Sequence, residues 1–466
     1  MMGLIYENVW VEGIPLQKLL TLEIVHKPNE HGRAILTAAG EIPVLKRFME
    51  RESEQLIAIK SRQEKKEVVL FRGYITQIRV DTKGGYGELS VELEDSSYLL
   101  DIRRQNKTYQ NLGKSYGEIL RDAYNGAGQV AVNVTDQPID KFILQMDETN
   151  WVFSKRMASR FNVPVFSNLV AEKAMVSLGV PSGKEAAELS TAAVRYMTDN
   201  GRFRNVTEND MTSGHMADVQ DFSFLQVDSY DYAYLGDMVR VNGKEYYVRA
   251  VHAKLIDGLM LMTYELTGRQ GFVVPLVRNN NCAGRVLTAQ VKAVKRDTIQ
   301  AFFFTIDSEY DSGSTTWFPY STAYSSSDGS GWYVMPEVGD FVRILCPSNH
   351  EEEAFAASAV NTSPPASTRN KSFRAPGGKE LLLTDDGISM ICNHQNIFID
   401  LSQDNGISIV STQPVHISSD KCVKIEADES VQIMADKQIM LQCGNSHVKL
   451  TEKQITFGGE SVIVGD

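Results

Sequence analysis

The stretch that decides the fold runs from Ile407 to Cys443. Divided at every eighth residue, it reads ISIVSTQP, VHISSDKC, VKIEADES, VQIMADKQ and IMLQC. Each octad begins with an apolar residue, has a second apolar residue two places later, and has a small residue two places after that. This alternation has the period of a β-strand with one buried face. The predicted core positions are Ile407, Ile409, Val415, Ile417, Val423, Ile425, Val431, Ile433, Ile439 and Leu441.

One octad is too short to enclose a core within a single chain. A strand advances about 3.3 Å per residue, so eight residues extend about 26 Å at most. A solenoid coil of one chain needs about 20 residues or more. Three chains that each supply one side can close a coil and bury the apolar stripe along a threefold axis. The repeat therefore predicts an intertwined, homotrimeric β-helical rod.

Shorter phrases of the same kind flank the repeat outside its strict spacing, at Ile388–Met390, Ile397–Ile399 and Val448–Leu450. Their loss of register predicts irregular ends for the rod. The alternative to a rod is a set of β-hairpins that share a spacing by chance.

Composition limits the remaining possibilities. A chain of 466 residues is long enough for three or more domains. A net charge of −12 disfavours a general nucleic-acid or acidic-membrane surface. The start lacks the basic and apolar segments of a secretory signal, and the five cysteines are far apart. We therefore expect synthesis in the cytoplasm, reduced thiols and no nucleic-acid specificity.

Apolar periodicity and breaking residues divide the rest of the chain. Residues 1–105 are expected to form β-strands, which return over 218–266 and again in a β unit over 276–361. Helices are expected for Lys114–Tyr124 and from about Asn150 to Phe161. A third helix is expected to begin at a Ser182/Glu185 capping box and to end at Asn200-Gly201. Two prolines among small polar residues at 362–368 indicate a domain boundary.

Motifs that imitate nucleotide and metal sites are incomplete. Gly113-Lys114-Ser115 resembles the end of a phosphate loop, but Thr108 occupies the first glycine position. His350-Glu351-Glu352-Glu353 begins like a zinc-protease helix, but Ala354 occupies the second ligand position. We expect this segment to be a surface loop with solvent-facing carboxylates, and we expect no metal or cofactor.

Neighbouring carboxylates are the remaining candidates for acid–base chemistry. The pairs Asp95 with Asp101 and Asp385 with Asp386 can in principle act on a glycan. Sequence proximity does not set the separation that such chemistry requires, so turn and surface roles are favoured. The sequence thus predicts no catalytic residue.

Several short segments, taken in order, resemble the VgrG-like tail-hub family of contractile phage tails and injection systems. The resemblance covers essentially the whole chain, through its order and spacing more than through any single motif. The segments are Phe71–Ile75, Ser97–Asp101, Tyr109-Gln110, Glu148–Phe153 with Arg156, Leu235–Asp237 with Val239, Trp317–Pro319, Met335–Val342 and Arg374–Leu381.

The resemblance implies a mainly β fold with a minor helical part: barrel-like hub domains, an OB-fold and an intertwined trimeric β-helix. It implies a structural hub and envelope-piercing spike that adapts a hexameric inner tube to a threefold spike within a tail, bacteriocin or injection particle. The competing readings are a β-helical glycan-degrading enzyme and a passive tail fibre or adhesin. The expected domains are a β hub domain over 1–105, a helical hub segment over 106–165, a second β hub domain over 166–272, an OB-fold over 273–361, a linker over 362–373 and a spike over 374–466.

The family also suggests partners. Inner-tube and baseplate proteins of the same particle are expected to bind the hub. Residues 455–466 alternate like a strand and contain no histidine for a metal-bound tip. We therefore expect a separate PAAR-like tip protein to bind there, at apolar side chains that include Val462 and Val464; a self-sealed end is the alternative.

Overall fold

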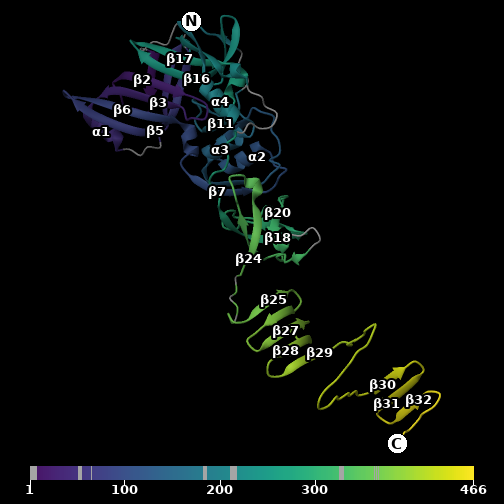
Figure 1. The fold of residues 1–466 in the computed structure, drawn as a ribbon. Coiled ribbons are helices and arrows are strands. Elements are labelled where there is room, and N and C mark those ends of the chain that lie inside the picture. Colours follow the sequence, from purple (N-terminus) through teal and green to yellow (C-terminus); the bar gives the residue numbers. More distant parts are fainter. Residues whose placement is uncertain are drawn as a thin grey trace. The chain divides into compact units, whose positions relative to one another are not determined.

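The computed structural model describes residues 8–50, 55–63, 66–181, 186–209, 218–324, 330–361, 363, 365 and 367–465. The chain divides into two compact units, Met1–Thr362 and Ser363–Asp466. Strands predominate in both, and the α-helices of the described residues all belong to the first unit (Figure 1). The predicted fold class, mainly β with a minor helical part, is confirmed.

A 12-stranded sheet forms the largest element of the first unit. Its order is β1-β4-β5-β6-β3-β2-β16-β17-β14-β13, with β15 paired to β16 and β12 paired to β15. The strands are β1 (Val9–Glu12), β2 (Lys18–His26), β3 (Arg33–Gly40), β4 (Ile57–Gln63), β5 (Lys66–Lys83), β6 (Tyr86–Asp95), β12 (Ala187–Glu188), β13 (Ala193–Thr198), β14 (Ser223–Ser229), β15 (Met238–Val241), β16 (Lys244–Ile256) and β17 (Leu259–Thr267).

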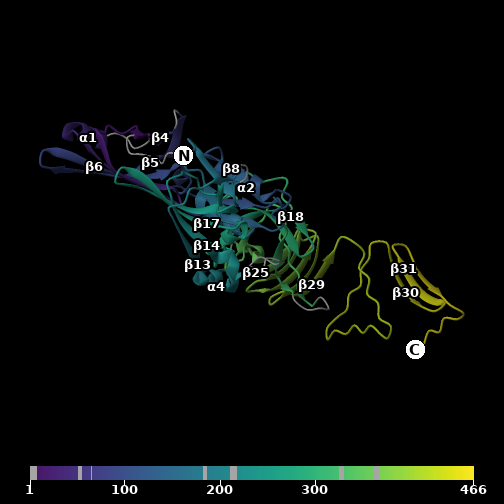
Figure 2. The ribbon, with the colours of Figure 1, turned by 90° about the horizontal axis from the view of Figure 1, so that it is seen from above.

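Two distant parts of the sequence meet in this sheet through β2 and β16 (Figure 1), where His26 pairs with Val251. Figure 2 shows β17, β14 and β13 following one another at the end of the sheet. Alternate residues of both parts point into one core, which contains Leu36 and Val91 from the early strands and Met262 from the late ones. The strands of the two expected β hub domains are therefore continuous with each other.

The described residues up to 272 are called the hub-like part below. Four α-helices and two small sheets complete it, as far as these residues show. Their bounds are α1 (Ile42–Met49), α2 (Tyr116–Tyr124), α3 (Asn150–Ser159), α4 (Asn200–Glu208), β7 (Arg104–Tyr109) with β9 (Ile143–Thr149), and β10 (Val165–Ser167), β11 (Ala174–Leu178) and β8 (Gly128–Val132) in a second sheet. Short 3₁₀-helices are η2 (Ser96–Leu100), η3 (Val219–Phe222), η4 (Arg269–Phe272) and η5 (Glu351–Glu353).

The helix predictions have mixed outcomes. Helix α2 forms as expected, with a capping box in which Ser115 and Glu118 bond each other's backbone N–H. Helix α3 also forms as expected, capped by Thr149. Helix α1 was not predicted, although Pro43 stands at its start and Leu45 and Phe48 form its buried face.

The third predicted helix is wrong. Residues 193–198 form β13 instead, because they pair along their whole length with β14. A helix begins only at Asn200, where the Asp199 side chain accepts the backbone N–H of Arg202. The proposed capping box at Ser182 and Glu185 lies outside the described residues.

A closed barrel follows, in the order β18-β19-β20-β24-β23. Its one parallel pair is β20 with β24, and β18 closes the barrel against β23. This order and direction of strands are those of an OB-fold. The strands are β18 (Val286–Lys295), β19 (Thr298–Phe302), β20 (Phe318–Ser321), β23 (Phe341–Leu345) and β24 (Phe355–Val360), with a β21 (Ala323–Tyr324) and β22 (Gly331–Trp332) hairpin beside them.

The second unit contains two antiparallel meanders separated by residues 412–437. The first is β25 (Lys371–Ala375), β26 (Lys379–Leu383), β27 (Gly387–Cys392), β28 (Ile397–Ser402) and β29 (Gly406–Ser411). The second is β30 (Gln438–Cys443), β31 (Ser446–Thr451) and β32 (Ile455–Gly458). Between them the chain carries no strand (Figure 1).

Candidate assembly surfaces

The five-stranded meander of the second unit has one apolar face. Cross-strand partners share a face, and the register aligns Phe373 with Leu381, Leu381 with Met390 and Met390 with Ile399. The following residues of this face are each at least 40% exposed: Phe373, Leu383, Ile388, Met390, Ile399, Leu401, Ile407 and Ile409. Nothing in the described part of the chain covers this face.

The middle octads are exposed as well. Val415, Ile417, Val423, Ile425, Val431 and Ile433 are between 54% and 72% exposed. The described residues of 412–437 form no strand ladder with another part of their own chain. Two apolar side chains in every octad thus remain in water, next to backbone groups that lack strand partners.

The second meander places Ile439 and Leu441 differently from the expectation of a fifth, equivalent octad. They belong to β30 and pair with Leu450 and Val448 of β31. Leu450 and Val448 in turn pair with Ile455 and Phe457 of β32. These residues form a second apolar face, on which Leu441, Ile455 and Phe457 are exposed.

The predicted strand over 455–466 is only partly correct. β32 ends at Gly458, and residues 460–465 form no regular structure. Val462 and Val464 both lie beyond the strand and are exposed, Val464 by 89%. The ladder edge that was expected at these two residues is therefore absent, because the chain leaves the sheet before it reaches them.

A buried ionic cluster in the first unit joins the barrel to the hub-like part. Arg156 of α3 donates to Glu148 through Nε (2.9 Å) and Nη2 (2.7 Å), and to Glu351 of η5 through Nη1 (2.9 Å). Glu351 also accepts the backbone N–H of Leu144 (3.0 Å) and the Asn279 side-chain amide (2.7 Å). Burial disfavours the charged guanidinium, but the carboxylates of Glu351 and Glu148 outweigh it and raise the pKa of Arg156.

This cluster corrects the prediction of a solvent-facing loop at His350–Glu353. Glu351 is only 1% exposed, because η5 packs against β9 and turns this carboxylate toward Arg156. Arg156 and Glu148 lie in one of the segments that resemble the tail-hub family, but no local sequence pattern indicates their distant partner Glu351. A charged residue at such a site requires an opposite charge, and Glu351 supplies it.

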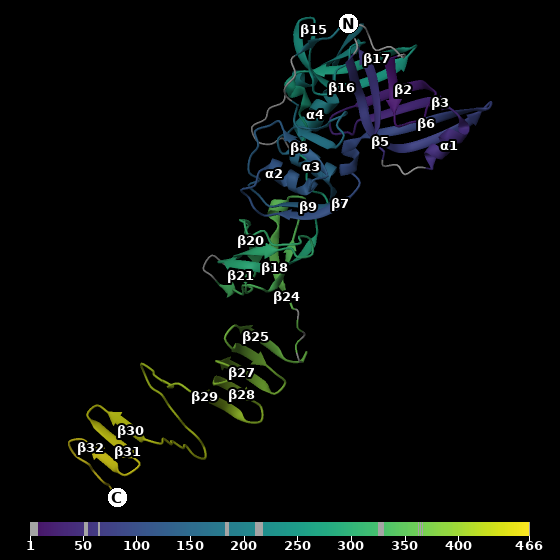
Figure 3. The same cartoon turned by 180° about the vertical axis from the view of Figure 1, so that it is seen from behind.

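Aromatic packing strengthens the same junction. Phe142, Leu144 and Met146, in and just before β9, lie in the hydrophobic core of the barrel. The Phe142 ring contacts the rings of Phe318 and Phe303, with centroids 5.0 and 5.8 Å apart. Figure 3 shows β7 and β9 next to the barrel strands. The barrel core is therefore completed by a strand of the hub-like part.

Comparison with known proteins agrees with this architecture. No family model and no curated protein matches the chain. The Escherichia coli c3393 protein, described as a type VI secretion component similar to the T4 phage tail proteins gp27 and gp5, is 13% identical; the match covers 76% of this chain and all of that one, with a TM-score of 0.54. VgrG–PdpA complexes of Francisella match in half-lidded form (9% identity, 86% and 87% coverage, TM-score 0.54) and lidded form (10%, 84% and 76%, TM-score 0.53).

The chain has the VgrG-like tail-hub fold. At this level of sequence identity, the similarity to these structures establishes the fold alone. Within the described residues, no helix is long and apolar enough to cross a membrane. No three His, Cys, Asp or Glu side chains in the described ranges are grouped so that they could hold a metal ion.

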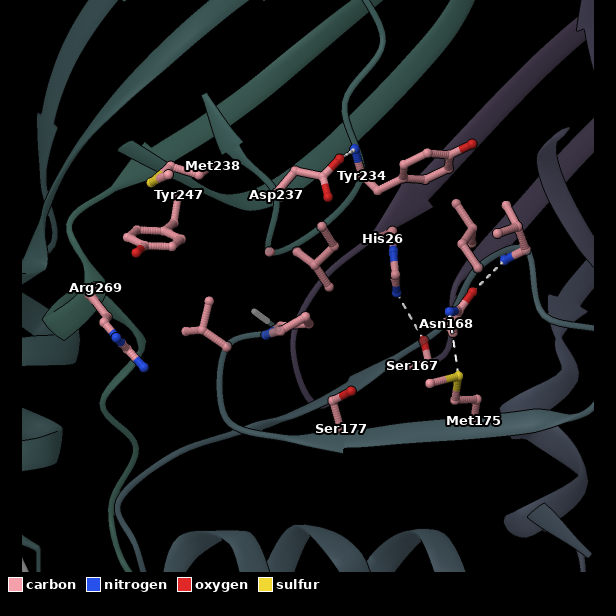
Figure 4. Close-up of a pocket in the computed structure, with 16 residues that line it drawn as sticks. His26, Ser167, Asn168, Met175, Ser177, Tyr234, Asp237, Met238, Tyr247 and Arg269 are labelled. Atoms are coloured by element: carbon pink, nitrogen blue, oxygen red, sulfur yellow. Dashed lines mark hydrogen bonds between the residues drawn. The ribbon is translucent and has the colours of Figure 1, made fainter. Parts of the chain in front are cut away.

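A cavity of about 320 Å³ in the hub-like part of this VgrG-like fold contains a serine and a histidine (Figure 4). His26 Nε2 lies 2.9 Å from Ser167 Oγ, and Ser167 donates to Asp95 Oδ2 at 2.6 Å. In a catalytic triad, the carboxylate accepts a hydrogen bond from the imidazole, and the imidazole accepts the proton of the serine hydroxyl. Here the Ser167 hydroxyl donates its hydrogen bond to the Asp95 carboxylate, and burial lowers the pKa of His26 to about 4. The hydrogen bonds among His26, Ser167 and Asp95 therefore fit a structural role and not a catalytic one.

Asp95 and Asp101, the first of the two carboxylate pairs considered for glycan chemistry, are engaged in hydrogen bonds within the fold. Asp95 is fully buried and caps η2 by accepting the Ser97 backbone N–H (2.9 Å), and it also accepts the Gly32 N–H (2.7 Å). Asp101 accepts a hydrogen bond from the Thr149 hydroxyl, and its Oδ2 lies 3.3 Å from His31 Nε2. A turn role therefore fits both residues, whereas a surface location is wrong for Asp95.

Proposed function

We propose that this chain is a structural hub and envelope-piercing spike of a contractile tail or injection machine, and that it works as a homotrimer. The observation that carries the proposal is the pair of uncovered apolar faces in the second unit, together with the unpaired octads between them. The VgrG-like fold, which the matches cover over 76–86% of the chain, supports the same role.

The occupant that fits these faces best is a second and third copy of the same segment. The apolar positions repeat every eight residues, so a partner that matches them needs the same repeat. Three identical chains satisfy this requirement at every octad. Burying one Val or Ile side chain stabilises the assembly by about 1.5–3 kcal/mol before entropy costs.

The first unit is proposed to bind the inner tube and baseplate of its own particle. For the chain as a whole, the proposed domains are 1–105, 106–165, 166–272 and 273–361, followed by the linker at 362–373 and the spike at 374–466. A PAAR-like tip protein is proposed to dock at the far end of the spike, where Val462 and Val464 are exposed. Synthesis in the cytoplasm followed by incorporation into the particle belongs to the same proposal.

We propose a role without catalysis. Ser167 donates its hydrogen bond to Asp95 and not to His26, which is the wrong direction for a nucleophile. Asp95 caps η2, and Asp101 accepts a hydrogen bond from Thr149 at the start of α3. A turnover assay on peptidoglycan tests this: the pure protein should release no fragments. Release that one carboxylate substitution abolishes would favour the glycan-degrading alternative.

Co-purification tests the assembly role. A tagged, full-length chain, expressed with the rest of its particle, should bring down tube and baseplate proteins through its first unit. A variant that ends at residue 362 should still do so if that unit is the adaptor. Retrieval of neither class of protein by the full chain would favour a passive fibre or adhesin.

A further inference from the structure

Two cysteines that lie far apart in the sequence are neighbours in the barrel. Cys282 precedes β18 and Cys346 follows β23, and both are buried in the same hydrophobic core. The backbone brings them together through Arg285, whose N–H donates to Cys282 O (3.0 Å) and whose carbonyl oxygen accepts the Cys346 N–H (3.0 Å). The Cys282 thiol donates a hydrogen bond to Ser348 O (3.4 Å).

These cysteines flank the ionic cluster that joins the barrel to the hub-like part. Asn279 stands shortly before Cys282, and Glu351 stands shortly after Cys346 in the sequence. Asn279 and Glu351 bond each other (2.7 Å), and both contact Leu144 of β9. A covalent bond between the two sulfurs would therefore fasten together the two barrel segments that hold the hub-like part.

We propose that Cys282 and Cys346 form a reversible disulfide when the protein meets a small disulfide oxidant such as oxidised glutathione. The Cys346 thiolate attacks one sulfur of the oxidant, whose S–S bond breaks, and a mixed disulfide forms as the first glutathione leaves. The Cys282 thiolate then attacks the Cys346 sulfur and displaces the second glutathione. The protein loses two electrons and two protons, and the oxidant takes them up as two thiols.

The order of attack follows from the contact between the thiols. The neighbouring Cys346 side chain raises the pKa of Cys282, whose thiol proton is held by Ser348 O, and the neighbouring Cys282 side chain lowers the pKa of Cys346. The group that more readily becomes a thiolate is the better first nucleophile. Both residues are buried, so the first step requires transient opening of the turn at 279–285. Oxidation is therefore expected to be slow and selective.

The bond would change the mechanics of the barrel. It would close a covalent loop from Cys282 to Cys346 that encloses β18 to β23. Closing a long loop restricts the unfolded chain and stabilises the folded one. The barrel would then resist unfolding more strongly in an oxidising compartment than in a reducing one. This inference concerns the first unit and does not depend on the proposed trimer.

The test uses the full, wild-type chain. The native protein is equilibrated with oxidised glutathione, its free thiols are alkylated, and its peptides are mapped by mass spectrometry. We expect a peptide pair joined through Cys282 and Cys346, and a thermal midpoint of the barrel raised by about 5 °C or more. Absence of the link, or a link that forms only in denaturant, would overturn the proposal.

Single variants resolve the roles of the two sulfurs. Cys282→Ser should trap glutathione on Cys346, because the resolving thiol is gone. Cys346→Ser should leave Cys282 unmodified over the same time. Cys392→Ser is the matched control and should form the barrel link at the wild-type rate. Equal trapping of glutathione on either remaining cysteine would contradict the assigned order of attack.

Discussion

The two units of this chain bury their apolar side chains in different ways. In the first unit, large side chains such as Trp151, Phe71 and Tyr264 are almost fully buried, and even its buried Arg156 is paired with carboxylates. In the second unit, many aliphatic residues at alternating positions are exposed by 40% or more. The first unit buries its core within one chain, whereas the second has the apolar pattern of a core but leaves most of it exposed in the single chain.

The largest effect is expected from a charge placed in the octad stripe. Ile425→Asp would bring three carboxylates together around a dry axis in the proposed trimer, so the rod should fail to assemble. Gel filtration with light scattering should show loss of the trimer, while the first unit keeps its folded circular dichroism signal. Gln432→Asp adds the same charge at an outward octad position and should leave assembly unchanged. Equal behaviour of the two variants would contradict the assignment of faces.

Removal of the buried cation should weaken the first unit alone. Arg156→Met leaves Glu148 and Glu351 buried without their partner, which should lower the free energy of unfolding of that unit by about 3–5 kcal/mol. Denaturant unfolding of residues 1–362 measures the change. Arg240→Met breaks an exposed pair with Glu245 and should cost about 1 kcal/mol or less. A small effect at Arg156 would show that the junction is not stabilised by this cluster.

Acid should also act on the first unit through His26. Burial, opposed by Asp95, lowers the pKa of His26 from 6.5 to about 4. The unfolded chain therefore binds a proton at higher pH than the folded one, so this contribution is fully present above pH 6.5 and is lost as pH falls toward 4. The loss should reach about 3 kcal/mol.

Unfolding curves between pH 7 and 4 measure this contribution. In His26→Gln the loss of stability over that range should be smaller than in the wild type by about this amount. His252→Gln changes an exposed histidine and is the control. Parallel curves for wild type and His26→Gln would mean that His26 titrates normally in the folded state.

The smallest expected effect concerns a helix cap. Ser115→Ala removes the side-chain bond to the Glu118 backbone N–H at the start of α2 and should cost about 1 kcal/mol in the first unit. Ser115→Thr, which keeps a hydroxyl, should recover most of the loss. A loss as large as that of Arg156→Met would indicate that α2 contributes more to the junction than its cap explains.

Sequence patterns revealed the features that depend on near neighbours. Helices α2 and α3 and the strands at the flanking phrases around Ile388, Ile397 and Val448 were predicted because apolar periodicity acts over a few residues. The flanking phrases do form strands, in β27, β28 and β31. These strands belong to antiparallel meanders, and irregular ends of a trimeric rod remain a prediction.

The missed features depend on contacts that are distant in the sequence. Arg156 meets Glu351, and Cys282 meets Cys346, only because the barrel closes on itself and on β9. Residues 193–198 were predicted to be helical, but pairing with β14 outweighs their local propensity. The exposure of Val415 to Ile433 in the single chain agrees with the argument that one octad is too short to enclose a core within one chain.

The molar mass of the wild-type chain in solution tests the central claim most directly. Light scattering of the purified, full-length protein should give three times the 52.0 kDa of one chain. Residues 1–362 alone should give a smaller assembly or a monomer, because the octads are missing. A full-length protein that remains monomeric at concentrations well above those in the particle would contradict the account, since the apolar faces of the second unit would then have no partner of their own kind.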